Sequence, residues 1–415
     1  MKILFLNAYF YPEKIAFTHL ERNIIEKLVS LGCEINVLCP VPTRGVSKEI
    51  INDYKSIKYE EILNGAVKVT RFWAPQEGKN ILIRAFRYFW CNFRQYQIGK
   101  KFKDCDLVFS VSTPPTQGMI AGMVAKKLSI PHIYSLQDIF PDSLVNAKIV
   151  NKNSIFWKLG RKIENYSYDN ANKIIVISET MKKNILNKGV LEKKIKVISN
   201  WIDLNDVQPI EKLKNPLLKK LNISVDDFIV LYAGNFGEAQ GTEIIFKVAK
   251  QLEEIKNLKF ILFGSGAYFE DAKQKAKYMK NIIINDLLPL EYVSQVYSLG
   301  NIALITCKKG TGTAGMPSKT WSIMACNTRI VASFDTDSEL AYILEKSGAG
   351  ICVEAENVEK LKDEIEKEYK VFILGVRKKI NTREYVKNYA SKEVCVNKYM
   401  NIIFQENKDK LKGKK

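Results

Sequence analysis

Residues 310–333, with the sequence GTGTAGMPSKTWSIMACNTRIVAS, carry groups that could bind an anion. Small residues lead to Pro317, and Pro is favoured at the first position of a helix because its missing N–H would have no partner there. Ser318 and Lys319 follow, so backbone N–H groups, a hydroxyl and an ammonium gather at one predicted helix N-terminus. Such a terminus attracts anions, and phosphate is the anion that we expect. An ordinary loop, helix and strand with a glycine-rich turn explains the same residues about equally well.

A second candidate for chemistry follows the apolar run 132–136, which is continued by Gln137 and Asp138. Asp138 could accept a hydrogen bond from a substrate hydroxyl or take its proton, whereas Gln137 could only orient groups. An Asp that caps the turn after a strand is the structural alternative. His19 and His132 are the only histidines. We expect His132, inside the apolar run, to be a core residue, and we retain His19 as a candidate contact to a substrate.

The elements that must position these residues alternate between apolar strands and amphipathic helices. The first part of the chain is predicted to hold strands at 2–6, 34–39, 67–72, 107–112, 132–136, 173–177 and 196–199, with helices at 17–30, 79–103, 119–128, 155–171 and 179–188. A polar stretch with two prolines, 203–226, is predicted to be a linker. The opening pattern then repeats, with strands at 228–233, 259–263, 282–284, 302–305, 329–333 and 350–353, and helices at 242–254 and 318–326.

Both halves begin with a strand, a loop, a helix and a second strand, so we predict an α/β fold with two doubly wound parallel sheets. Ligands of such sheets bind beside the carboxyl ends of the strands. Two sheets that face each other would therefore form a ligand cleft between domains. The loops predicted to line it are 7–14, 113–117, 137–143, 234–241, 264–266 and 306–318.

Composition limits the class of protein. A chain of 415 residues is long enough for two or three domains with substantial cores. No apolar run reaches the ~18 residues of a membrane span, and the apolar start is interrupted by Asn7, which favours a buried first strand over a signal peptide. The eight cysteines include no CxxC pair. We therefore expect reduced core cysteines in a cytoplasmic protein, without a zinc site.

The formal net charge of +19 predicts an anionic partner. Residues 79–103 carry seven cations and no acid, interleaved with apolar and aromatic residues, among them Phe86 and Trp90. This composition is typical of a helix that lies at a membrane surface, with its aromatics at headgroup depth. A core helix with a solvated basic face is the alternative. The basic residues 408–415 are predicted to form a disordered tail.

Six short motifs in order resemble the family-4 retaining glycosyltransferases of GT-B fold, and most closely the branch that includes the L-fucosamine transferases of bacterial capsule and O-antigen synthesis. The resemblance covers nearly the whole chain. The motifs are Tyr11-Pro12-Glu13, residues 137–143 (QDIFPDS), Ile177-Ser178-Glu179, Asn200-Trp201-Ile202-Asp203, Tyr232-Ala233-Gly234-Asn235-Phe236 and Met316-Pro317-Ser318-Lys319-Thr320-Trp321.

The resemblance implies two Rossmann-like domains, with residues 1–204 binding the acceptor and 205–390 binding a nucleotide-sugar. Residues 391–415 would form a helix that crosses back to the first domain, followed by the basic tail. It implies transfer with retention of anomeric configuration, a UDP-sugar donor, no metal and no other cofactor. The lipid-linked glycan acceptor, a polyprenyl diphosphate, would place the enzyme in the cytoplasm, peripheral on the inner face of the plasma membrane.

The resemblance also implies site residues. The frequent His-Asp pair of the family matches Gln137 and Asp138, the predicted catalytic residues. The predicted acceptor-binding residues are Tyr11, Glu13, Thr18, His19, Arg84 and Arg87. The predicted donor-binding residues are Gly234, Asn235, Phe236, Gly237, Gln240, Gly264, Ser265, Leu287, Gly315, Met316, Pro317, Ser318, Lys319 and Glu339.

The donor motif departs from the family at several positions. Asn235 and Gln240 stand where many members have Arg and Lys, which leaves more of the phosphate charge to Lys319. The two family glutamates fall at Ala314 and Ser322, so recognition of sugar hydroxyls must come from other groups. A deoxy-N-acetyl sugar, such as N-acetyl-L-fucosamine, would fit that loss. Glu339 lies near a family cleft glutamate, but residues 336–339 also match a capping box.

Three other classes remain open at this point. Asp104-Cys105-Asp106 and Asp335-Thr336-Asp337 match the short DxD pattern of metal-dependent GT-A transferases. A UDP-sugar 2-epimerase would share the predicted two-sheet architecture. A basic nucleic-acid-binding protein would explain the charge, although we predict no nucleic-acid partner.

Overall fold

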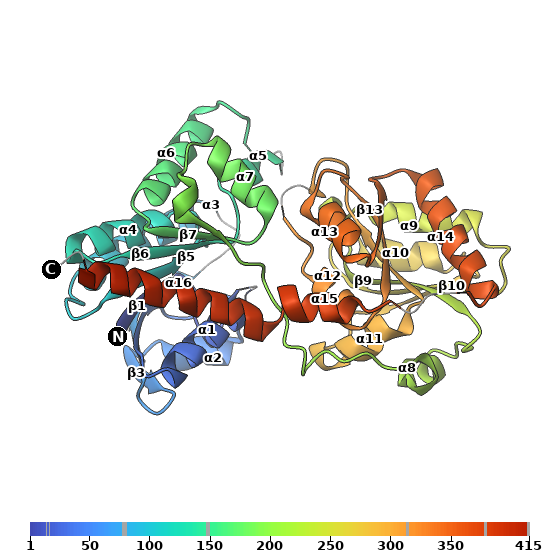
Figure 1. Ribbon diagram of the computed structural model, residues 1–415, viewed down its shortest axis with the longest axis horizontal. Helices are drawn as coiled ribbons and strands as arrows, with labels where there is room; N and C mark the ends of the chain where they lie inside the picture. Colours follow the sequence, from blue (N-terminus) through green and yellow to red (C-terminus); the bar gives the residue numbers. More distant parts are fainter. Residues whose placement is uncertain are drawn as a thin grey trace. The chain divides into compact units, whose positions relative to one another are not determined.

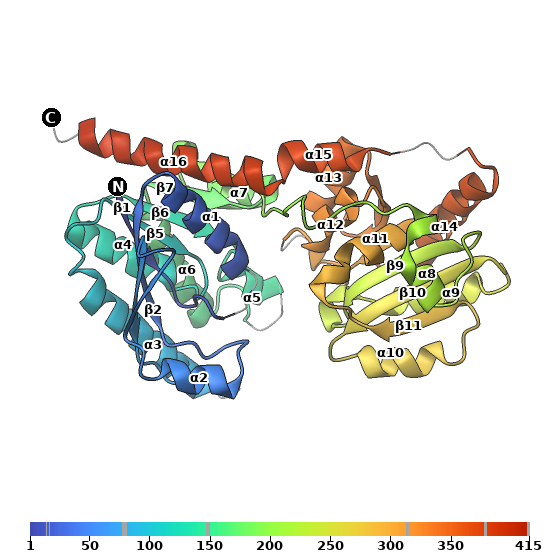
Figure 2. The same cartoon turned by 90° about the horizontal axis from the view of Figure 1, so that it is seen from below.

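The structure, a computed structural model, describes residues 1–13, 15, 17–76, 81–146, 150–312, 315–376 and 380–412. The chain forms two compact units, which Figures 1 and 2 show as ribbons. Unit 1 comprises Met1–Ser199 and Cys395–Lys415, and unit 2 comprises Asn200–Val394. Within the described part of the chain, no helix is long and apolar enough to cross a membrane. All eight cysteines are free thiols.

Unit 1 is built on an eight-stranded sheet with the order β3-β4-β2-β1-β5-β6-β7-β8. All neighbours are parallel except β3 and β4. The central strands β1, β5 and β6 are buried along nearly their whole length because helices cover both of their faces. The strands are β1 (Lys2–Leu6), β2 (Glu34–Pro40), β3 (Tyr59–Ile62), β4 (Val67–Phe72), β5 (Leu107–Val111), β6 (His132–Leu136), β7 (Lys173–Val176) and β8 (Ile195–Val197).

Two layers of helices cover the sheet of unit 1. The helices are α1 (Thr18–Ser30), α2 (Lys48–Tyr54), α3 (Ile81–Gly99), α4 (Gln117–Leu128), α5 (Asp142–Asn146), α6 (Ile155–Asp169), α7 (Glu179–Asn187) and α16 (Lys392–Lys412). The side chains of α3 and α4 share a core cluster with β1 and β5, and those of α6 and α7 share another with β6 and β7. The ring of Phe109 on β5 packs against two other rings. Its centroid lies 4.8 Å from that of Phe5 on β1 and 6.2 Å from that of Tyr399 on α16. The last helix of the chain therefore completes the core of unit 1.

Unit 2 is built on a six-stranded parallel sheet with the order β11-β10-β9-β12-β13-β14. Its strands are β9 (Phe228–Asn235), β10 (Leu258–Ser265), β11 (Ile282–Asp286), β12 (Ile302–Thr306), β13 (Arg329–Phe334) and β14 (Gly350–Glu354). Its helices are α8 (Pro216–Lys220), α9 (Glu243–Gln251), α10 (Phe269–Ala276), α11 (Val293–Leu299), α12 (Lys319–Ala325), α13 (Glu339–Ser347), α14 (Val358–Ile373) and α15 (Thr382–Tyr389). The predicted α/β fold with two parallel sheets is confirmed.

Three predictions about the elements are wrong. Residues 203–226 are not a free linker, because Leu217 and Ile223 are buried in the core of unit 2 and Pro216 begins α8. The predicted disordered tail is helical as far as Lys412, and residues 413–415 lie outside the described part. Between β2 and β4, the chain adds a helix, α2, and an antiparallel edge strand, β3, that the sequence did not predict.

Candidate active site

The predicted donor-binding residues of unit 2 include Lys319, which begins α12 near the carboxyl ends of β9 and β12. Its Nζ lies 4.1 Å from the centre of the Tyr232 ring. A Cβ atom on Gly234 would lie only 2.5 Å from the same nitrogen, and Gly234 has φ +155°. Only glycine therefore leaves the ammonium group in this place.

The charge of Lys319 has little compensation from the protein. Burial lowers the pKa of Lys319 to about 8. Among the described residues no carboxylate forms an ion pair with Lys319, and its ammonium makes a cation–π contact with the Tyr232 ring. A cation that has lost its hydration and has no counter-ion binds anions strongly, because the anion replaces the stabilisation that water gave to the charge. This arrangement fits the predicted phosphate site.

Two uncharged side chains lie at the rim of the same loop. Asn235 Nδ2 donates to Gln240 Oε1 at 3.0 Å, and Tyr232 Oη donates to the carbonyl oxygen of Asn235 at 2.8 Å. Gly266 and Gly237 keep this loop close-packed, because a Cβ on either would lie within 2.6 Å of an Asn235 side-chain atom. Amide groups thus occupy the positions where the resemblance places family cations.

Three of the predicted donor-binding residues, Phe236, Gly264 and Ser265, make close contacts with one another. The N–H of Phe236 donates to Ser265 O at 2.7 Å, so it is not available to an anion. The Phe236 side chain is fully buried, and a Cβ on Gly264 would lie 2.2 Å from its ring. Phe236, Gly264 and Ser265 therefore support the loop. The neighbouring N–H of Leu287 donates to Gly264 O, while the Leu287 side chain is half exposed.

The start of α12 holds the remaining predicted donor residues. Thr320 Oγ1 donates to Pro317 O at 2.8 Å and closes the turn before the helix. Met316 packs against the core of unit 2, Ser318 is exposed, and the space beside Gly315 is open. Ala314, one of the positions where the family has a glutamate, lies outside the described residues; Ser322 lies within α12.

Asp335 has a structural role, whereas Glu339 stays a predicted donor-binding residue. The Asp335 carboxylate accepts hydrogen bonds from Gly310 N at 2.9 Å and Gly312 N at 2.7 Å, so this DxD aspartate holds a loop. The capping box at residues 336–339 is absent, because Ser338 caps α13 by accepting from Ala341 N. Glu339 is buried in the first turn of α13.

In unit 1, Gln137 and Asp138 follow β6 directly. The Gln137 N–H donates to Ser112 Oγ at 2.9 Å, and Gln137 Nε2 donates to Ser135 Oγ at 3.1 Å. The same Ser135 Oγ lies 3.1 Å from Tyr399 Oη. Asp138 is exposed at the end of the strand. Crowding by protein atoms nonetheless raises its pKa above the usual 3.8, against the opposing hydrogen bond from Ser143. A surface carboxylate with a raised pKa is suited to take a proton.

The predicted acceptor residues on the first loop and helix divide into two groups. Glu13 is buried, and Glu13 Oε1 accepts from Thr43 N at 2.8 Å and Arg44 N at 2.9 Å, so its carboxylate holds loop backbones together. Thr18 Oγ1 donates to Ile15 O at 2.9 Å at the start of α1. Tyr11 and His19 are exposed, in positions open to a ligand.

His132 is a core residue, as predicted. It is fully buried in β6, its Nε2 lies 2.8 Å from Ser110 Oγ, and burial lowers its pKa to about 3. The ring is therefore neutral at physiological pH, and His132 lies at the amino end of β6, whereas Gln137 and Asp138 follow the carboxyl end.

Arg84 and Arg87 of α3 differ in their exposure to solvent. Arg84 is exposed, whereas Arg87 is only 1% exposed and donates to the carbonyl oxygen of Pro75. The prediction that Arg87 contacts an acceptor or a lipid phosphate is wrong for this reason. Phe86 and Phe89 are exposed by 53% and 67%, and Arg94 stacks over Trp90. Lys79 and its neighbours at 77–80 lie outside the described residues.

Sequence reasoning missed Tyr232 and Tyr399. Tyr232 forms the ring face beneath the Lys319 ammonium, and Tyr399 reaches the strand-end polar groups from the far end of the chain. The signals for Tyr232 were its place at the end of an apolar run and in the motif Tyr232-Ala233-Gly234-Asn235-Phe236, and neither indicated a contact with Lys319. Nothing local in the sequence relates Tyr399 to Ser135, because 264 residues separate them.

Both halves of the chain match family models. Residues 21–206 match Glycosyltransferase Family 4, and residues 214–393 match Glycosyl transferases group 1. Sucrose-phosphate synthase from Thermosynechococcus elongatus has a TM-score of 0.71 at 16% identity, over 97% of this chain and 98% of that one. Alr3699/HepE from Anabaena, solved with UDP, has a TM-score of 0.71 at 13% identity, over 98% of this chain and all of that one. The fold and the two matches identify the chain as a glycosyltransferase of GT-B fold.

The curated relatives agree with this class. WbjE of Pseudomonas aeruginosa, provisionally named a glycosyltransferase, is 25% identical over 70% of this chain and 73% of WbjE. WcaI of Escherichia coli K12, provisionally named a colanic acid biosynthesis glycosyl transferase, is 24% identical over 97% of this chain and 100% of WcaI. The chain is therefore a transferase enzyme, and the GT-A fold and a non-enzymatic nucleic-acid-binding protein are excluded. The L-fucosamine branch remains a prediction.

Proposed function

We propose that the protein transfers a sugar from a UDP-sugar to a lipid-linked glycan during polysaccharide synthesis, with retention of configuration. The observation that carries this proposal is the uncompensated ammonium of Lys319 beside Gly234. A diphosphate supplies the missing counter-charge, and the UDP in the structure of Alr3699/HepE supports a uridine nucleotide. WcaI, which is similar over nearly the whole chain, supports a role in polysaccharide synthesis.

The proposed donor sugar is an N-acetylated deoxyhexosamine such as N-acetyl-L-fucosamine. Among the residues that can approach it, Asn235 and Gln240 offer amide groups that are already hydrogen-bonded to each other. Amide groups can hydrogen-bond the acetamido group of such a sugar. A sugar with few hydroxyls also suits this site, because a bound hydroxyl without a hydrogen-bond partner would be destabilising.

The proposed transfer relies on fixed protein charges and dipoles. Lys319 neutralises the charge that develops on the leaving diphosphate. Asp138, exposed and with a raised pKa, accepts a hydrogen bond or proton from the acceptor, and Gln137 orients neighbouring groups. Gln137 stands where many members of the family have His, and an amide cannot act as a base. We therefore favour a front-face reaction, in which the leaving phosphate guides the acceptor. No metal is required by this scheme, and transfer should persist in EDTA.

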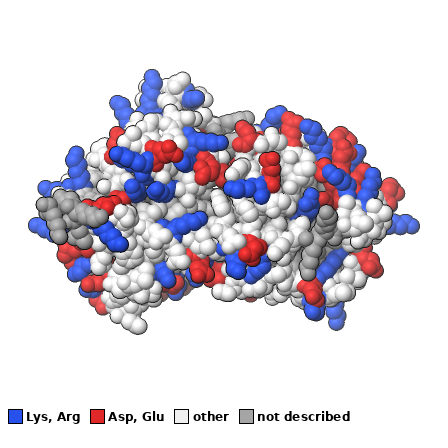
Figure 3. All heavy atoms as spheres, viewed as in Figure 1, with Lys and Arg blue, Asp and Glu red and all other residues white. Residues whose placement is uncertain are grey.

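We propose that the protein is cytoplasmic and binds peripherally to the inner face of the plasma membrane. Phe86, Phe89 and Phe93 are exposed on α3, beside the exposed Arg84. Exposed aromatics next to cations suit the headgroup layer, where a polyprenyl-diphosphate acceptor is presented. On the face shown in Figure 3, Lys and Arg lie among Asp and Glu, without the continuous basic surface that nucleic acid would favour.

A donor panel tests this function directly. UDP-N-acetyl-L-fucosamine, UDP-N-acetylglucosamine, UDP-glucose, GDP-mannose and dTDP-rhamnose are incubated with the protein, and thermal stabilisation and release of nucleotide are measured. We expect the UDP-sugars to stabilise the fold and to release UDP slowly. Stabilisation by GDP- or dTDP-sugars alone would overturn the choice of nucleotide. Conversion of UDP-N-acetylglucosamine to its 2-epimer would reveal an epimerase.

A further inference from the structure

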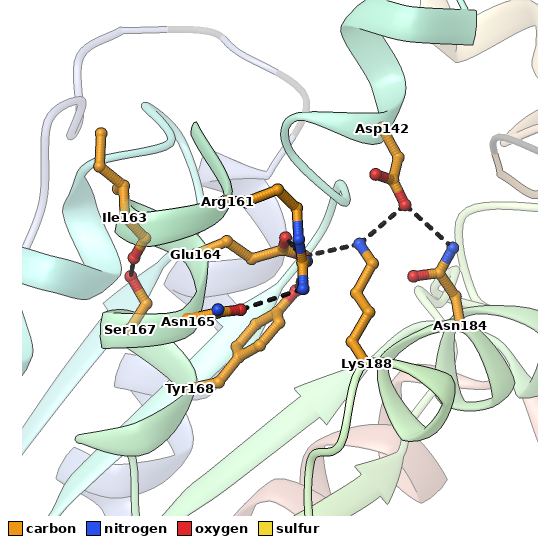
Figure 4. A network of polar contacts seen from close by, with 9 residues as sticks. All are labelled: Asp142, Arg161, Ile163, Glu164, Asn165, Ser167, Tyr168, Asn184 and Lys188. Carbon is orange, nitrogen blue, oxygen red and sulfur yellow. Dashed lines mark hydrogen bonds and ion pairs between the residues drawn. The ribbon is translucent and has the colours of Figure 1, made fainter. Parts of the chain in front are cut away.

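A partly buried cluster of charged side chains lies beside the segment that carries Asp138. Lys188, at the C-terminal end of α7, is near its centre, and Figure 4 shows its side chain between two carboxylates. Lys188 Nζ lies 2.7 Å from Asp142 Oδ2 and 2.8 Å from Glu164 Oε1. The Lys188 side chain is 13% exposed. One cation thus connects α5, α6 and α7.

The two carboxylates differ in their other partners. Glu164 also accepts from Tyr168 Oη at 2.7 Å and pairs with Arg161, so several groups hold it. Asp142 has a hydrogen bond from Asn184 Nδ2 at 3.2 Å, and Lys188 is its only ion-pair partner among the described residues. Loss of Lys188 would therefore release Asp142 and leave Glu164 in place.

Asp142 is close to the candidate catalytic carboxylate. It is the first residue of α5, four residues after Asp138. Asp138 and Phe140 line a small cavity together with Tyr134, Glu164 and Tyr168. The cavity has room for about one water molecule, so a sugar cannot enter it. The cluster therefore acts on Asp138 from behind, away from the substrate.

We propose that Lys188 is a positioning residue for Asp138: by bridging Asp142 and Glu164, it fixes the strand-end segment against α6 and α7 and neutralises the carboxylate of Asp142, four residues from Asp138. This inference rests on the proposed function, in which Asp138 contacts the acceptor. It adds a residue that touches neither substrate.

The electrostatic consequence has a definite sign. The pKa of Asp138 is raised mainly by desolvation and also by the negative charge of Asp142, while hydrogen bonds from Ser143 and the Ile139 N–H lower it. Facing groups on the packed elements are Glu164, Arg161 and Tyr168 of α6, Tyr134 of β6 and Lys188. Removing Lys188 leaves the charge of Asp142 unopposed, so the pKa of Asp138 rises further. Asp138 would then stay protonated to higher pH.

The test compares pH profiles of matched variants. Lys188→Met removes the cation, Lys188→Arg retains it, and Asp142→Asn removes the opposing charge with almost no change in shape. Lys182→Met, on the same helix, is the control, because its ion pair with Glu192 is at the surface. The rate measured is release of UDP from the UDP-sugar that the donor panel selects, from pH 5 to 9.

We expect Lys188→Met to move the acidic limb of the kcat profile upward by about half a pH unit or more, and Asp142→Asn to move it downward. Lys188→Arg should restore the wild-type limb, and the KM for the donor should not change. An unchanged limb in folded Lys188→Met, or shifts of the same sign in Lys188→Met and Asp142→Asn, would overturn the positioning role.

Failure of the proposed function would give a different result. If Asp138→Asn turns over at the wild-type rate, Asp138 has no part in transfer, and the role of Lys188 falls with it. If Asp138→Asn is impaired while Lys188→Met keeps the wild-type profile and thermal stability, only the positioning role is overturned. Should Lys188→Met fail to fold, the opposite shift expected for Asp142→Asn still decides the question.

Discussion

The ammonium nitrogen of Lys319 lies 4.1 Å from the centre of the Tyr232 ring, where burial lowers the pKa of Lys319 to about 8. A ring face stabilises a cation only modestly compared with a carboxylate. We therefore expect an anion to stabilise the Lys319 ammonium more than the Tyr232 ring does. Binding of a diphosphate should be tightest when the lysine carries its proton.

The first prediction follows from this titration. Calorimetry of UDP binding should show an affinity that falls about tenfold between pH 7 and pH 9, because the lysine loses its charge above about 8. At pH 7, Lys319→Met should weaken UDP by about 1.5–3 kcal/mol and remove the pH dependence. Lys308→Met, which breaks an exposed ion pair with Glu238, serves as control and should bind like wild type. Unchanged UDP affinity in folded Lys319→Met would remove Lys319 from the site.

The second prediction concerns the glycine opposite Lys319. Gly234→Ala adds a methyl group 2.5 Å from Nζ, so the ammonium group must move. We expect UDP affinity to fall at least tenfold. If the effect passes through Lys319, the double variant Gly234→Ala/Lys319→Met should bind no worse than Lys319→Met alone. Additive losses would show that Gly234 contributes to binding by another route.

The third prediction concerns Asp138. Asp138→Asn keeps the shape of the side chain but removes the base, so turnover should fall at least tenfold while UDP affinity stays within about twofold. Steady-state kinetics and calorimetry on the same preparation separate the two effects. Wild-type turnover would leave Asp138 as the residue that ends β6 and no more.

The fourth prediction uses the contrast between two arginines on α3. Arg87→Ala should lower the free energy of unfolding by about 3 kcal/mol, because it removes a buried charged group that bonds Pro75 O and leaves space in the core. Arg84→Ala, on the exposed side, should change it by less than about 0.5 kcal/mol. Urea denaturation measures both values. Equal effects would contradict the orientation of α3.

The fifth prediction tests the membrane surface without disturbing the core. Phe86→Ser/Phe89→Ser with Arg84→Glu should abolish co-sedimentation with anionic liposomes, while UDP binding survives. Tyr278→Ser/Leu290→Ser is the matched control, since both residues are highly exposed in unit 2. Retained liposome binding in the α3 variant would leave those aromatics without the proposed role. Arg87 is not altered, because its substitution would test folding instead.

The alternation of apolar runs predicted both sheets, because fully buried parallel strands consist of continuous apolar residues. The same rule fails for short amphipathic segments. Leu217 and Ile223 are separated by polar residues and flanked by prolines, so their burial in unit 2 has no periodic signature. The edge strand β3, with two glutamates in four residues, is likewise formed by pairing with β4 and not by its own composition.

The site was predicted best where backbone conformation sets it. The glycine loop required Gly234, and this residue does lie next to the Lys319 ammonium. Pro317 was predicted at the first position of the helix, but α12 begins two residues later, at Lys319, with Ser318 as its N-cap. Side-chain direction was not predictable. Arg84 and Arg87 are three residues apart in an identical basic context, and only the packing of α3 decides which one is buried. Ser338 replaced Thr336 as the cap of α13 because its hydroxyl reaches Ala341 N.

The contact of Tyr399 with Ser135 has a consequence for biosynthesis. Tyr399 is translated 264 residues after Ser135, which also accepts a hydrogen bond from Gln137. Residues 1–199 and all of unit 2 are therefore translated before α16 can bring Tyr399 against Phe109 and Ser135. Unit 1 acquires these core contacts only after the whole of unit 2 has been made.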